Sequence, residues 1–497
     1  MVNNVTYDYI IIGAGMGGIT AGLELASNNK KVLILEKNSL PGGCVTTFKK
    51  GRFEFDMSLY DLYDYGSLDK KGDIRKLFSD YNIDIETEVV PFNARVKDLA
   101  TGDDFKVGGN IDDFFVELEK LKCGSAESLK EFLRVIKEIN EAVETLKRGN
   151  NDLNDYPKFL KYLDSNVIDA LADLKMPRET INRLSFMWIY LGSPLDKLSF
   201  IDFAVFMYKL IFKKRTVLKN KNIDMALKMI NRYQDLGGKI YYHSNVIEIT
   251  DSGLSNKLVK TSDGKEYKCR EVVCNLSKRY VYSNLIKTED KDVNRLENAR
   301  TLAPNAVIVY LGLNKDYASL GFKNYHYYQF QNLNSTLNVK NMTNIYHETF
   351  DAVVPNVVNE FASPKNTTIL VIKTTYFGDT FAKLNRENYV ETKEKIANNL
   401  IEQFEKAFNI DISEYIEEME IVTPLSIANF VNSPNGSIMG YMRKSYDNAI
   451  HRLLSYEDEK IPNIHFVGGA SIFGAGVHNA IYSGYYIAKK VLESEAK

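Results

Sequence analysis

The chain has 497 residues, and its 63 basic side chains nearly balance its 65 acidic ones, which leaves a formal net charge of −2. Apolar residues make up 44% and charged residues 26%, as in ordinary globular proteins. This length exceeds the roughly 250–300 residues at which one hydrophobic core stops growing, so we expect two or more lobes. The balanced charge gives no basic footprint, and we therefore exclude nucleic acid as a partner.

The cysteines and the hydropathy pattern bear on metal binding and location. Cys44, Cys123, Cys269 and Cys274 form neither a CxxC pair nor a zinc-binding spacing, so we predict no metal site. Unpaired cysteines of this kind fit a reducing compartment. No apolar run approaches the roughly 18 residues that a membrane span needs. We expect a cytoplasmic protein, either free or bound peripherally at the inner membrane surface.

The chain begins with a pattern typical of a strand, a glycine-rich turn, a helix and a second strand. Tyr9–Ile12 and Val32–Leu35 are short apolar runs that predict buried parallel strands. Between them, Gly13, Gly15 and Gly18 form GxGxxG. In this motif the glycines allow a tight turn, close approach of a pyrophosphate and close packing of the helix on the sheet, and the helix N-terminus attracts phosphate.

The residues after the second strand indicate which dinucleotide is bound. Glu36 stands at the end of that strand, where a carboxylate can bind the ribose hydroxyls of either NAD or FAD. An NAD-binding domain would soon continue with a second set of βαβ units. Instead, the turn-rich segment LPGGCVTTFKKGRFEFD follows from Leu40 to Asp56. This difference favours FAD.

Two segments together resemble one group of flavoproteins. The first is LPGGCVTTFKKGRFEFDMSLY, and the second is IPNIHFVGGASIFGAGVHNAIYSGYYIAKKVL near the other end of the chain. They resemble the phytoene desaturase, carotene isomerase and retinol saturase relatives within the amine-oxidase-like flavoprotein superfamily. The resemblance follows nearly the whole chain in order, and it is dense in these end regions and sparse in the middle.

The resemblance implies an α/β fold. A Rossmann-like FAD-binding domain of the three-layer ββα, glutathione-reductase-like type would be interleaved with an α+β substrate-binding domain. The FAD-binding domain would comprise residues 1–90, 216–294 and 455–497. The substrate-binding domain would comprise residues 91–215, which form its helical part, and 295–454.

The resemblance also implies the residues that contact non-covalent FAD. The main chain of Val246 would meet adenine, and the turn before the last helix would lie under the pyrimidine side of the flavin ring. Cys44 is expected as a small residue beside FAD, because it has no partner cysteine four or five residues away. The full set is Gly13, Gly15, Met16, Gly17, Gly18, Glu36, Lys37, Gly42, Gly43, Cys44, Val246, Gly469, Ala470, Gly476, Val477 and His478.

Within the segment from Leu40 to Asp56, the residue types suggest different tasks. Gly42 and Gly43 allow close backbone approach to the cofactor. Phe53 and Phe55 are expected to anchor the segment in the core. Arg52 or Lys49 is expected to face phosphate.

Apolar periodicity predicts most of the remaining elements. Helices are expected over 112–121, 126–147, 159–174 and 389–408, and strands over 306–313 and 367–375. The most apolar segment, residues 186–215, is interrupted at Pro194. It is either a core helix of the second lobe or an amphipathic segment that lines a lipid tunnel or contacts a membrane surface.

Three residues are candidates for catalysis. His478 stands at a predicted helix start near the ring, as an acid or base or as a simple cap. Tyr441 belongs to a segment with Gly436, Ser437 and Gly440 that resembles the substrate side of the family's site. Tyr60 stands where many relatives have histidine, and could replace it as a hydrogen-bond donor or weak acid.

The predicted activity is hydride transfer between flavin N5 and a carbon of an apolar unsaturated substrate. Carotenoids, retinoids and fatty-acid-like lipids fit, and desaturation, saturation and cis–trans isomerisation share the required geometry. No separate NAD domain is visible, so an unidentified electron donor or acceptor is needed. The alternatives are a flavin amine oxidase and a flavin-free escort protein that binds prenyl lipids.

Overall fold

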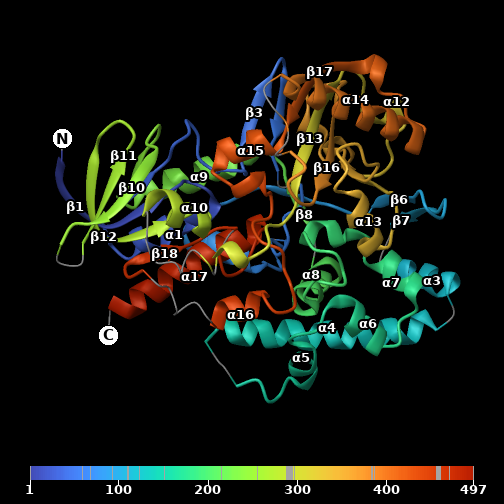
Figure 1. Cartoon of the computed structure of the whole chain (residues 1–497), viewed down its shortest axis with the longest axis horizontal. Coiled ribbons are helices and arrows are strands. Elements are labelled where there is room, and N and C mark those ends of the chain that lie inside the picture. The colour runs from blue at the N-terminus through green and yellow to red at the C-terminus, as the bar shows by residue number, and fades with distance from the viewer. Residues whose placement is uncertain are drawn as a thin grey trace.

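The computed structural model describes most of the chain, and in Figure 1 it forms two sheet-based lobes side by side, with a helical part below the second. Both ends of the chain lie in the first lobe. The described residues are 2–58, 60–67, 69–91, 93–108, 111–122, 124–149, 152–213, 215–253, 256–286, 295, 297–381, 384, 387–454, 461–469 and 471–495.

The first lobe is built on a sheet whose core is parallel. The long strand β1 lies between β12 and β2 and is parallel to both. Strands β9 and β18 extend this parallel part, whereas β10 and β11 pair antiparallel beyond β12 as a meander. The bounds are β1 Val2–Ile12, β2 Val32–Leu35, β9 Lys239–Tyr241, β10 Val246–Asp251, β11 Lys257–Thr261, β12 Glu266–Cys274 and β18 Ile464–Phe466.

Successive residues of β1 face opposite layers, as the two-residue period of a strand requires. Tyr9 and Ile11 pack in the cluster that holds the helices, and Ile10 and Ile12 pack in the cluster that holds the meander. The helices are α1 Met16–Ser27, α9 Asn222–Asp235 and α17 Val477–Glu495, and the other layer adds α10 Lys278–Tyr280 and the π-helix η2 Val281–Leu285. This is the predicted Rossmann-like, three-layer α/β arrangement.

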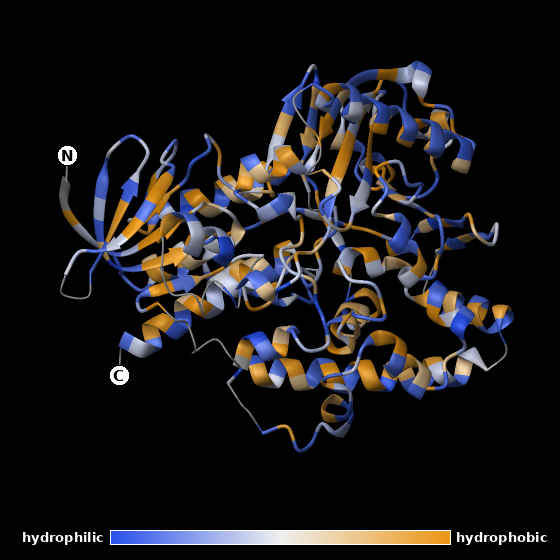
Figure 2. Ribbon diagram, viewed as in Figure 1, coloured by the Kyte–Doolittle hydropathy of each residue, from blue (hydrophilic) through white to orange (hydrophobic). Residues whose placement is uncertain are grey.

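The second lobe has a mixed seven-stranded sheet in the order β17-β13-β16-β15-β14-β6-β7. Helix α14 covers one face with an apolar stripe that includes Leu400 and Phe404. The central strands β13 and β16 are mainly hydrophobic in Figure 2, whereas β6, β7 and β17 alternate with charged residues. The bounds are β6 Ala94–Asp98, β7 Asp104–Val107, β13 Asn305–Leu313, β14 His326–Phe330, β15 Phe350–Val353, β16 Thr368–Tyr376, β17 Ile416–Val422 and α14 Tyr389–Phe408.

A hairpin from the glycine-rich segment covers the opposite face of this second sheet. It consists of β3 Thr47–Lys50 and β4 Phe53–Asp56. Phe53 and Phe55 are both 0% exposed and pack with Tyr310 of β13. A Cβ atom on Gly312 would lie 2.6 Å from the Phe53 ring, so this glycine makes room for the aromatic anchor. The prediction that both phenylalanines are core anchors is confirmed.

The helical part differs from the prediction in one place. Residues 159–174 do not form one helix, because Asn166 starts a new helix by accepting the backbone N–H of Asp169 at 2.9 Å. The break at Pro194 is confirmed. The bounds are α3 Ile111–Leu121, α4 Ser125–Lys147, α5 Pro157–Tyr162, α6 Val167–Asp173, α7 Arg178–Leu184, the 3₁₀ turn η1 Phe186–Leu191 and α8 Phe200–Phe212.

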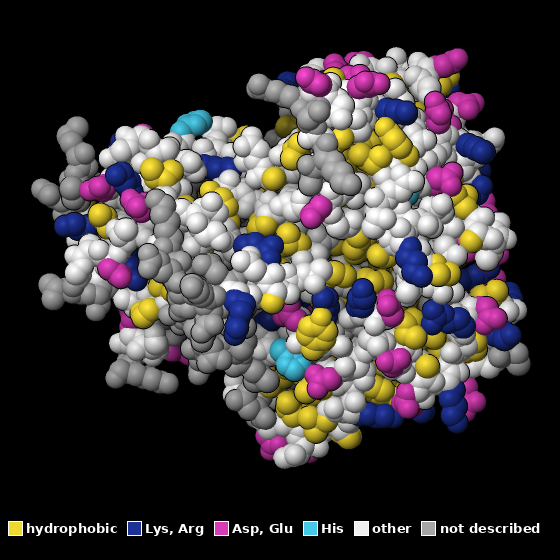
Figure 3. Space-filling model, in the orientation of Figure 1, with side chains coloured by type: hydrophobic (Ala, Val, Ile, Leu, Met, Phe, Trp, Pro, Cys, Tyr) yellow, Lys and Arg dark blue, Asp and Glu magenta, His cyan; other side chains and the backbone are white. Residues whose placement is uncertain are grey.

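Short elements connect these parts. They are α2 Asp73–Asp80, the paired strands β5 Thr87–Val89 and β8 Thr216–Leu218, α12 Tyr317–Leu320, α13 Ser335–Asn341, η3 Pro355–Val357, η4 Glu360–Ala362, η5 Ser413–Tyr415, α15 Pro424–Val431, η6 Pro434–Gly436 and α16 Ala449–Leu454. Acidic and basic side chains are interspersed over the face shown in Figure 3. Among the described helices, none is both long and apolar enough to cross a membrane.

Candidate functional site

The glycine-rich turn leaves the N-terminus of α1 without a side-chain cap. Gly13 has a φ of +95°, which only glycine adopts readily, and Gly15 is the N-cap of α1. The first turn of α1 contains no acidic side chain. The first N–H groups of a helix have no partner within the helix, so this end is suited to bind an anion.

Asn275 lies opposite this turn and was not predicted from the sequence. It directly follows β12, and its backbone N–H donates to the carbonyl of Ile12 at 2.9 Å. A Cβ atom on Gly15 would collide with the Asn275 side-chain amide. Its place after the carboxyl end of a parallel strand is a signal that could have found it, because ligands of open α/β sheets bind at that edge.

Helices α1 and α17 cross so closely that glycine is required on both. A Cβ atom on Gly17 would lie 2.6 Å from the backbone N of Gly468 and 3.1 Å from the carbonyl oxygen of Ala480. A Cβ atom on Gly484 would collide with the carbonyl oxygen of Gly17. This crossing brings the turn before α17 against the turn before α1, although the two are distant in sequence.

Glu36 is a buried carboxylate at the end of β2, with 5% exposure. Its Oε2 accepts the N–H of Ala14 at 2.7 Å, and its Oε1 accepts the N–H of Asn38 at 2.8 Å. Burial raises the pKa of Glu36, and these two hydrogen bonds oppose that rise. The carboxylate therefore links the glycine-rich turn to the next loop and keeps lone pairs for a further donor.

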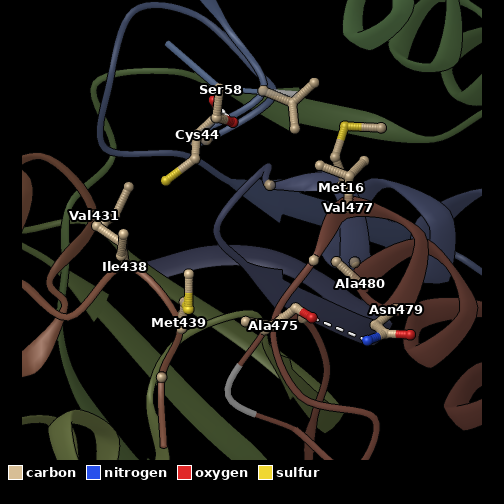
Figure 4. A pocket seen from close by; sticks show the side chains of 18 of the residues that line it. Met16, Cys44, Ser58, Val431, Ile438, Met439, Ala475, Val477, Asn479 and Ala480 are labelled. Carbon is tan, nitrogen blue, oxygen red and sulfur yellow. Dashed lines mark hydrogen bonds between the residues drawn. The ribbon is translucent and has the colours of Figure 1, made fainter. Parts of the chain in front are cut away.

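A cavity of about 610 Å³ joins these parts to the second lobe. In Figure 4, Cys44 and Ser58 lie on one side, Val431, Ile438 and Met439 on another, and Ala475 and Val477 on the α17 side. The predicted cofactor residues that line it are Gly13, Gly15, Met16, Gly17, Glu36, Lys37, Gly42, Gly43, Cys44, Val246, Gly469, Gly476, Val477 and His478. Gly18 does not line it and packs against Gly13 instead. Ala470 lies outside the described residues.

Two of these predicted cofactor residues, Lys37 and Cys44, differ in what they do at the cavity wall. Lys37 Nζ donates to the carbonyl of Asn429 at 2.5 Å and to the Asn432 side chain at 2.8 Å, which ties the end of β2 to α15. Cys44 opens onto the cavity, and burial raises the pKa of its thiol to about 11. Such a thiol stays protonated at neutral pH, so Cys44 is suited to packing beside a ligand and not to nucleophilic attack.

The prediction that Arg52 or Lys49 faces phosphate is wrong. Arg52 lies at the tip of the β3–β4 hairpin and forms a bidentate pair with Glu417, at 2.9 and 2.6 Å. Neither Arg52 nor Lys49 lines the cavity. A carboxylate on β17, distant in sequence, competes for the guanidinium, and local sequence gave no sign of it.

His478 belongs to a buried ionic cluster with Lys209 of α8 and Asp64. Lys209 Nζ lies 2.6 Å from His478 Nε2 and 3.4 Å from the Asp64 carboxylate. Burial and the neighbouring Lys209 lower the pKa of His478 well below its ordinary value, so its ring is neutral. Burial also lowers the pKa of Lys209 to about 8. Lys209, which the sequence did not single out, is therefore the group here that titrates nearest neutral pH.

We expect Asp64→Asn to lower the free energy of unfolding by about 2 kcal/mol at neutral pH. Burial alone would raise the pKa of Asp64, but its cationic neighbours, Lys209 first and then Lys213, lower it to about 2. Because the folded-state pKa is depressed, this stabilisation is present above the ordinary value of 3.8 and is lost as pH falls towards 2. Denaturation of both proteins across this range measures it. The control Asp73→Asn, at an exposed pair with Lys76, should change little.

The other two candidate catalytic residues line the cavity with hydroxyl groups that already have partners. Tyr60 donates to the carbonyl of Asp56 at 2.6 Å, and burial raises its pKa well above the ordinary value. Tyr441 donates to Glu297 at 2.8 Å, and burial together with Glu297 raises its pKa to about 12. Both phenols are neutral hydrogen-bonding groups at neutral pH.

The segment from 186 to 215 lies mostly in the core of the helical part. Phe200, Phe203 and Met207 of α8 are buried, while Ile201 and Phe206 reach the cavity wall. The segment thus supplies both part of the core and part of the cavity wall, and a lipid tunnel stays a prediction. Contact with a membrane surface stays a prediction, as do the domain boundaries.

Comparison with known proteins gives relatives along nearly the whole chain. Residues 11–67 match a family model described as an NAD(P)-binding Rossmann-like domain. Prolycopene isomerase 2 of an Oncidium hybrid cultivar is 22% identical over 98% of this chain and 84% of its own. The 4,4'-diaponeurosporene oxygenase of Staphylococcus haemolyticus is 23% identical over 98% of this chain and 97% of its own. The all-trans-retinol 13,14-reductase of Danio rerio is 20% identical over 87% of this chain and 77% of its own.

Solved structures show the same fold over the full length. Putrescine oxidase bound to putrescine superposes with a TM-score of 0.64 at 13% identity, covering 99% of this chain and 100% of that one. An oxidoreductase from Methanosarcina mazei gives a TM-score of 0.64 at 12% identity, covering 99% and 100%. The resemblance predicted from the two end segments is confirmed: the chain is an enzyme homologous to these isomerases, oxygenases and reductases, and it has the fold of putrescine oxidase.

Proposed function

We propose that this enzyme is an FAD-dependent oxidoreductase that transfers a hydride between flavin N5 and a carbon of an unsaturated, largely apolar lipid. The observation that supports this most strongly is the single cavity that joins the uncapped N-terminus of α1 and Glu36 to an apolar chamber beside the second sheet. The relatives named for polyene substrates favour carotenoid-like or retinoid-like compounds.

The residues at the first lobe fit FAD. The uncapped first turn of α1 can hold the pyrophosphate with the main chain at Gly15, Met16 and Gly17, and Gly469 would adjoin it. Glu36 keeps acceptor capacity for the ribose hydroxyls. Gly42 and Gly43 have φ angles of +103° and +61°, a backbone conformation that favours glycine. Because glycine has no side chain, the main chain here can approach the cofactor closely.

Around the ring, this chain's own residues would bind, orient and exclude water. Bound flavin supplies two-electron redox chemistry at N5. The N-terminus of α17 at Val477 provides the positive end of a helix dipole, which favours negative charge beside it. Lys209 Nζ holds a proton at neutral pH next to the neutral ring of His478. Met439, Ile438 and Val431 form an apolar wall opposite the α17 turn (Figure 4).

Desaturation, saturation and cis–trans isomerisation all fit this proposed hydride transfer, and the anaerobic titration below distinguishes among them. An electron donor or acceptor is required for the first two. A cytoplasmic location, free or at the inner membrane surface through residues 186–215, belongs to the same proposal. The amine-oxidase likeness is a likeness of fold, so amine oxidation stays the alternative. A flavin-free lipid escort is the other.

Absorbance of the purified protein tests the cofactor, and anaerobic titration tests the reaction. We expect two flavin bands between about 350 and 480 nm and a stoichiometric spectral change when carotenoids, retinoids or unsaturated fatty acids meet oxidised or reduced protein. Protein that stays colourless after incubation with FAD would instead support the escort alternative. Release of hydrogen peroxide on addition of amines, without any response to lipids, would support amine oxidation.

A further inference from the structure

The part of the cavity beside the second sheet carries a group of buried polar side chains. Asp351 of β15, Lys373 of β16, Tyr190 of η1 and Asp61 line it together with apolar residues such as Val353. These groups pair with other side chains, but Asp351 Oδ1 and Asp61 Oδ1 have no hydrogen-bond partner among the described residues, and a pure hydrocarbon would leave both atoms unsatisfied, which costs free energy. Their presence indicates a substrate that is apolar along its length and polar at one place.

Asp351 and Lys373 are cross-strand neighbours whose pairing leaves one carboxylate oxygen available. They face each other in the register of β15 and β16, with Lys373 Nζ 3.3 Å from Asp351 Oδ2. Asp351 is only 6% exposed, and its Oδ1 has no hydrogen-bond partner among the described residues. A buried carboxylate oxygen normally accepts a hydrogen bond, so this atom is a site for a donor from a ligand.

Asp61 supplies a second acceptor of the same kind. Its Oδ2 accepts from Arg215 at 3.3 Å and lies 3.1 Å from His326 Nε2. Its Oδ1, in a side chain that is 5% exposed, has no hydrogen-bond partner within the described residues. Burial would raise the pKa of Asp61, but Arg215 and His326 outweigh it and hold the pKa below its ordinary value.

The charges of this group select among possible ligand head groups. The carboxylate of Asp351 is paired with Lys373, and that of Asp61 is paired with Arg215 and His326. A ligand carboxylate would add negative charge beside these two acids, and an ammonium group would add positive charge next to Lys373. A hydroxyl group is neutral, can donate to Asp351 Oδ1 and can accept from Lys373 Nζ.

We propose that the substrate is a hydroxyl-bearing unsaturated lipid, and that Asp351 and Lys373 bind its hydroxyl group while the apolar walls bind its chain. This inference deepens the proposed function and rests on it, since the same cavity must hold the carbon–carbon double bond against the flavin. The hydroxyl group then fixes which carbons of the chain lie beside the ring.

Four compounds with one polyene chain and different head groups test the inference. They are all-trans-retinol, its methyl ether, retinoic acid and retinylamine. Binding to the FAD-loaded protein is measured by quenching of its intrinsic fluorescence, which needs no turnover. We expect the alcohol to bind about tenfold more tightly than each of the others, because only it donates and accepts without adding charge.

Two variants assign the selectivity to these residues. In Asp351→Asn, the amide oxygen faces Lys373 and the NH₂ group faces the cavity, so the preference for alcohol over ether should fall from about tenfold to about equal. Lys373→Met removes a donor from which both the hydroxyl oxygen and the ether oxygen can accept, so it should weaken the binding of both compounds. The control is Asp447→Asn. Asp447, like Asp351, is in an ion pair, at 3.0 Å to Arg300 and 2.9 Å to Arg452, but it does not line the cavity. It should keep the preference.

The remaining outcomes separate failure of the hydroxyl-binding inference from failure of the proposed function. Equal binding of alcohol and ether to the wild type would overturn the inference, while a flavin response to lipids would leave the proposed function standing. Tightest binding of the amine would overturn it in favour of an ammonium site. If none of the four compounds binds and no lipid changes the flavin spectrum, both statements are overturned.

Discussion

Replacing Gly484 with alanine is expected to lower the free energy of unfolding by about 3 kcal/mol and to abolish most of the FAD binding. The new Cβ atom would collide with the carbonyl oxygen of Gly17 and lie 3.0 Å from the backbone N of Ala21. Backbone atoms inside a helix cannot rotate away, so α17 must move as a body and take the turn at Gly476 with it. Urea denaturation and FAD titration measure the two effects.

Gly22 of α1, the helix that α17 crosses, provides the control. A Cβ atom on Gly22 of α1 would lie 3.1 Å or more from its neighbours, which are the ends of side chains of Tyr233, Ile34 and Ile11. Those ends can shift, and alanine gains about 1 kcal/mol of helix propensity over glycine. We expect Gly22→Ala to leave stability within about 1 kcal/mol and FAD binding unchanged. Equal damage from both variants would show that the backbone collision is not the cause.

Glu36→Gln is expected to weaken FAD binding about a hundredfold while the protein stays folded. Glu36 accepts from two backbone N–H groups, at 2.7 and 2.8 Å. The glutamine amide has one oxygen, so its NH₂ group must face one of those donors. The carboxylate lone pairs that would accept from the ribose hydroxyls are then lost. Equilibrium titration with FAD gives the ratio of dissociation constants, and Glu54→Gln on the exposed side of β4 should bind FAD like the wild type.

We also expect the affinity for FAD to depend on pH through Glu36. Burial raises the pKa of Glu36 above its ordinary value of 4.5. Ribose hydroxyls donate to the ionised carboxylate, so protonation competes with binding, and the affinity for FAD should fall as pH drops through this raised pKa. Glu36→Gln carries no such proton, and its affinity should show no matching change. A parallel decline in both proteins would mean that another group titrates.

Local sequence was enough to predict the amino-terminal βαβ unit because its signals are short-range. The run Tyr9–Ile12, the glycines at 13 and 15 and the acid at 36 lie within one βαβ unit, and each has a single physical purpose there. The helix expected over 159–174 was wrong for the converse reason. Apolar periodicity continues through the break, and only the capping side chain of Asn166 marks it.

The polar part of the cavity could not be predicted, because its partners meet across long sequence separations. Asp61 lies 154 positions from Arg215 and 265 from His326. None of these residues carries a local motif, and charged residues usually lie on the surface. Gly484 was missed for a similar reason, since a glycine within a terminal helix looks unfavourable until the helix it crosses is known.

The closure of the first lobe has a consequence for synthesis of the chain. The hydroxyl of Tyr9 on β1 donates to Glu495 on α17, 486 positions later, and β1 pairs along its length with β12. A ribosome that has made the first βαβ unit can pair β1 with β2, but the other edge of β1 stays unpaired until β12 has been made. Such non-local pairing slows folding. We therefore expect the amino-terminal segment to bind chaperones that recognise apolar strands, and the proposed FAD site is complete only after the start of α17 has been made.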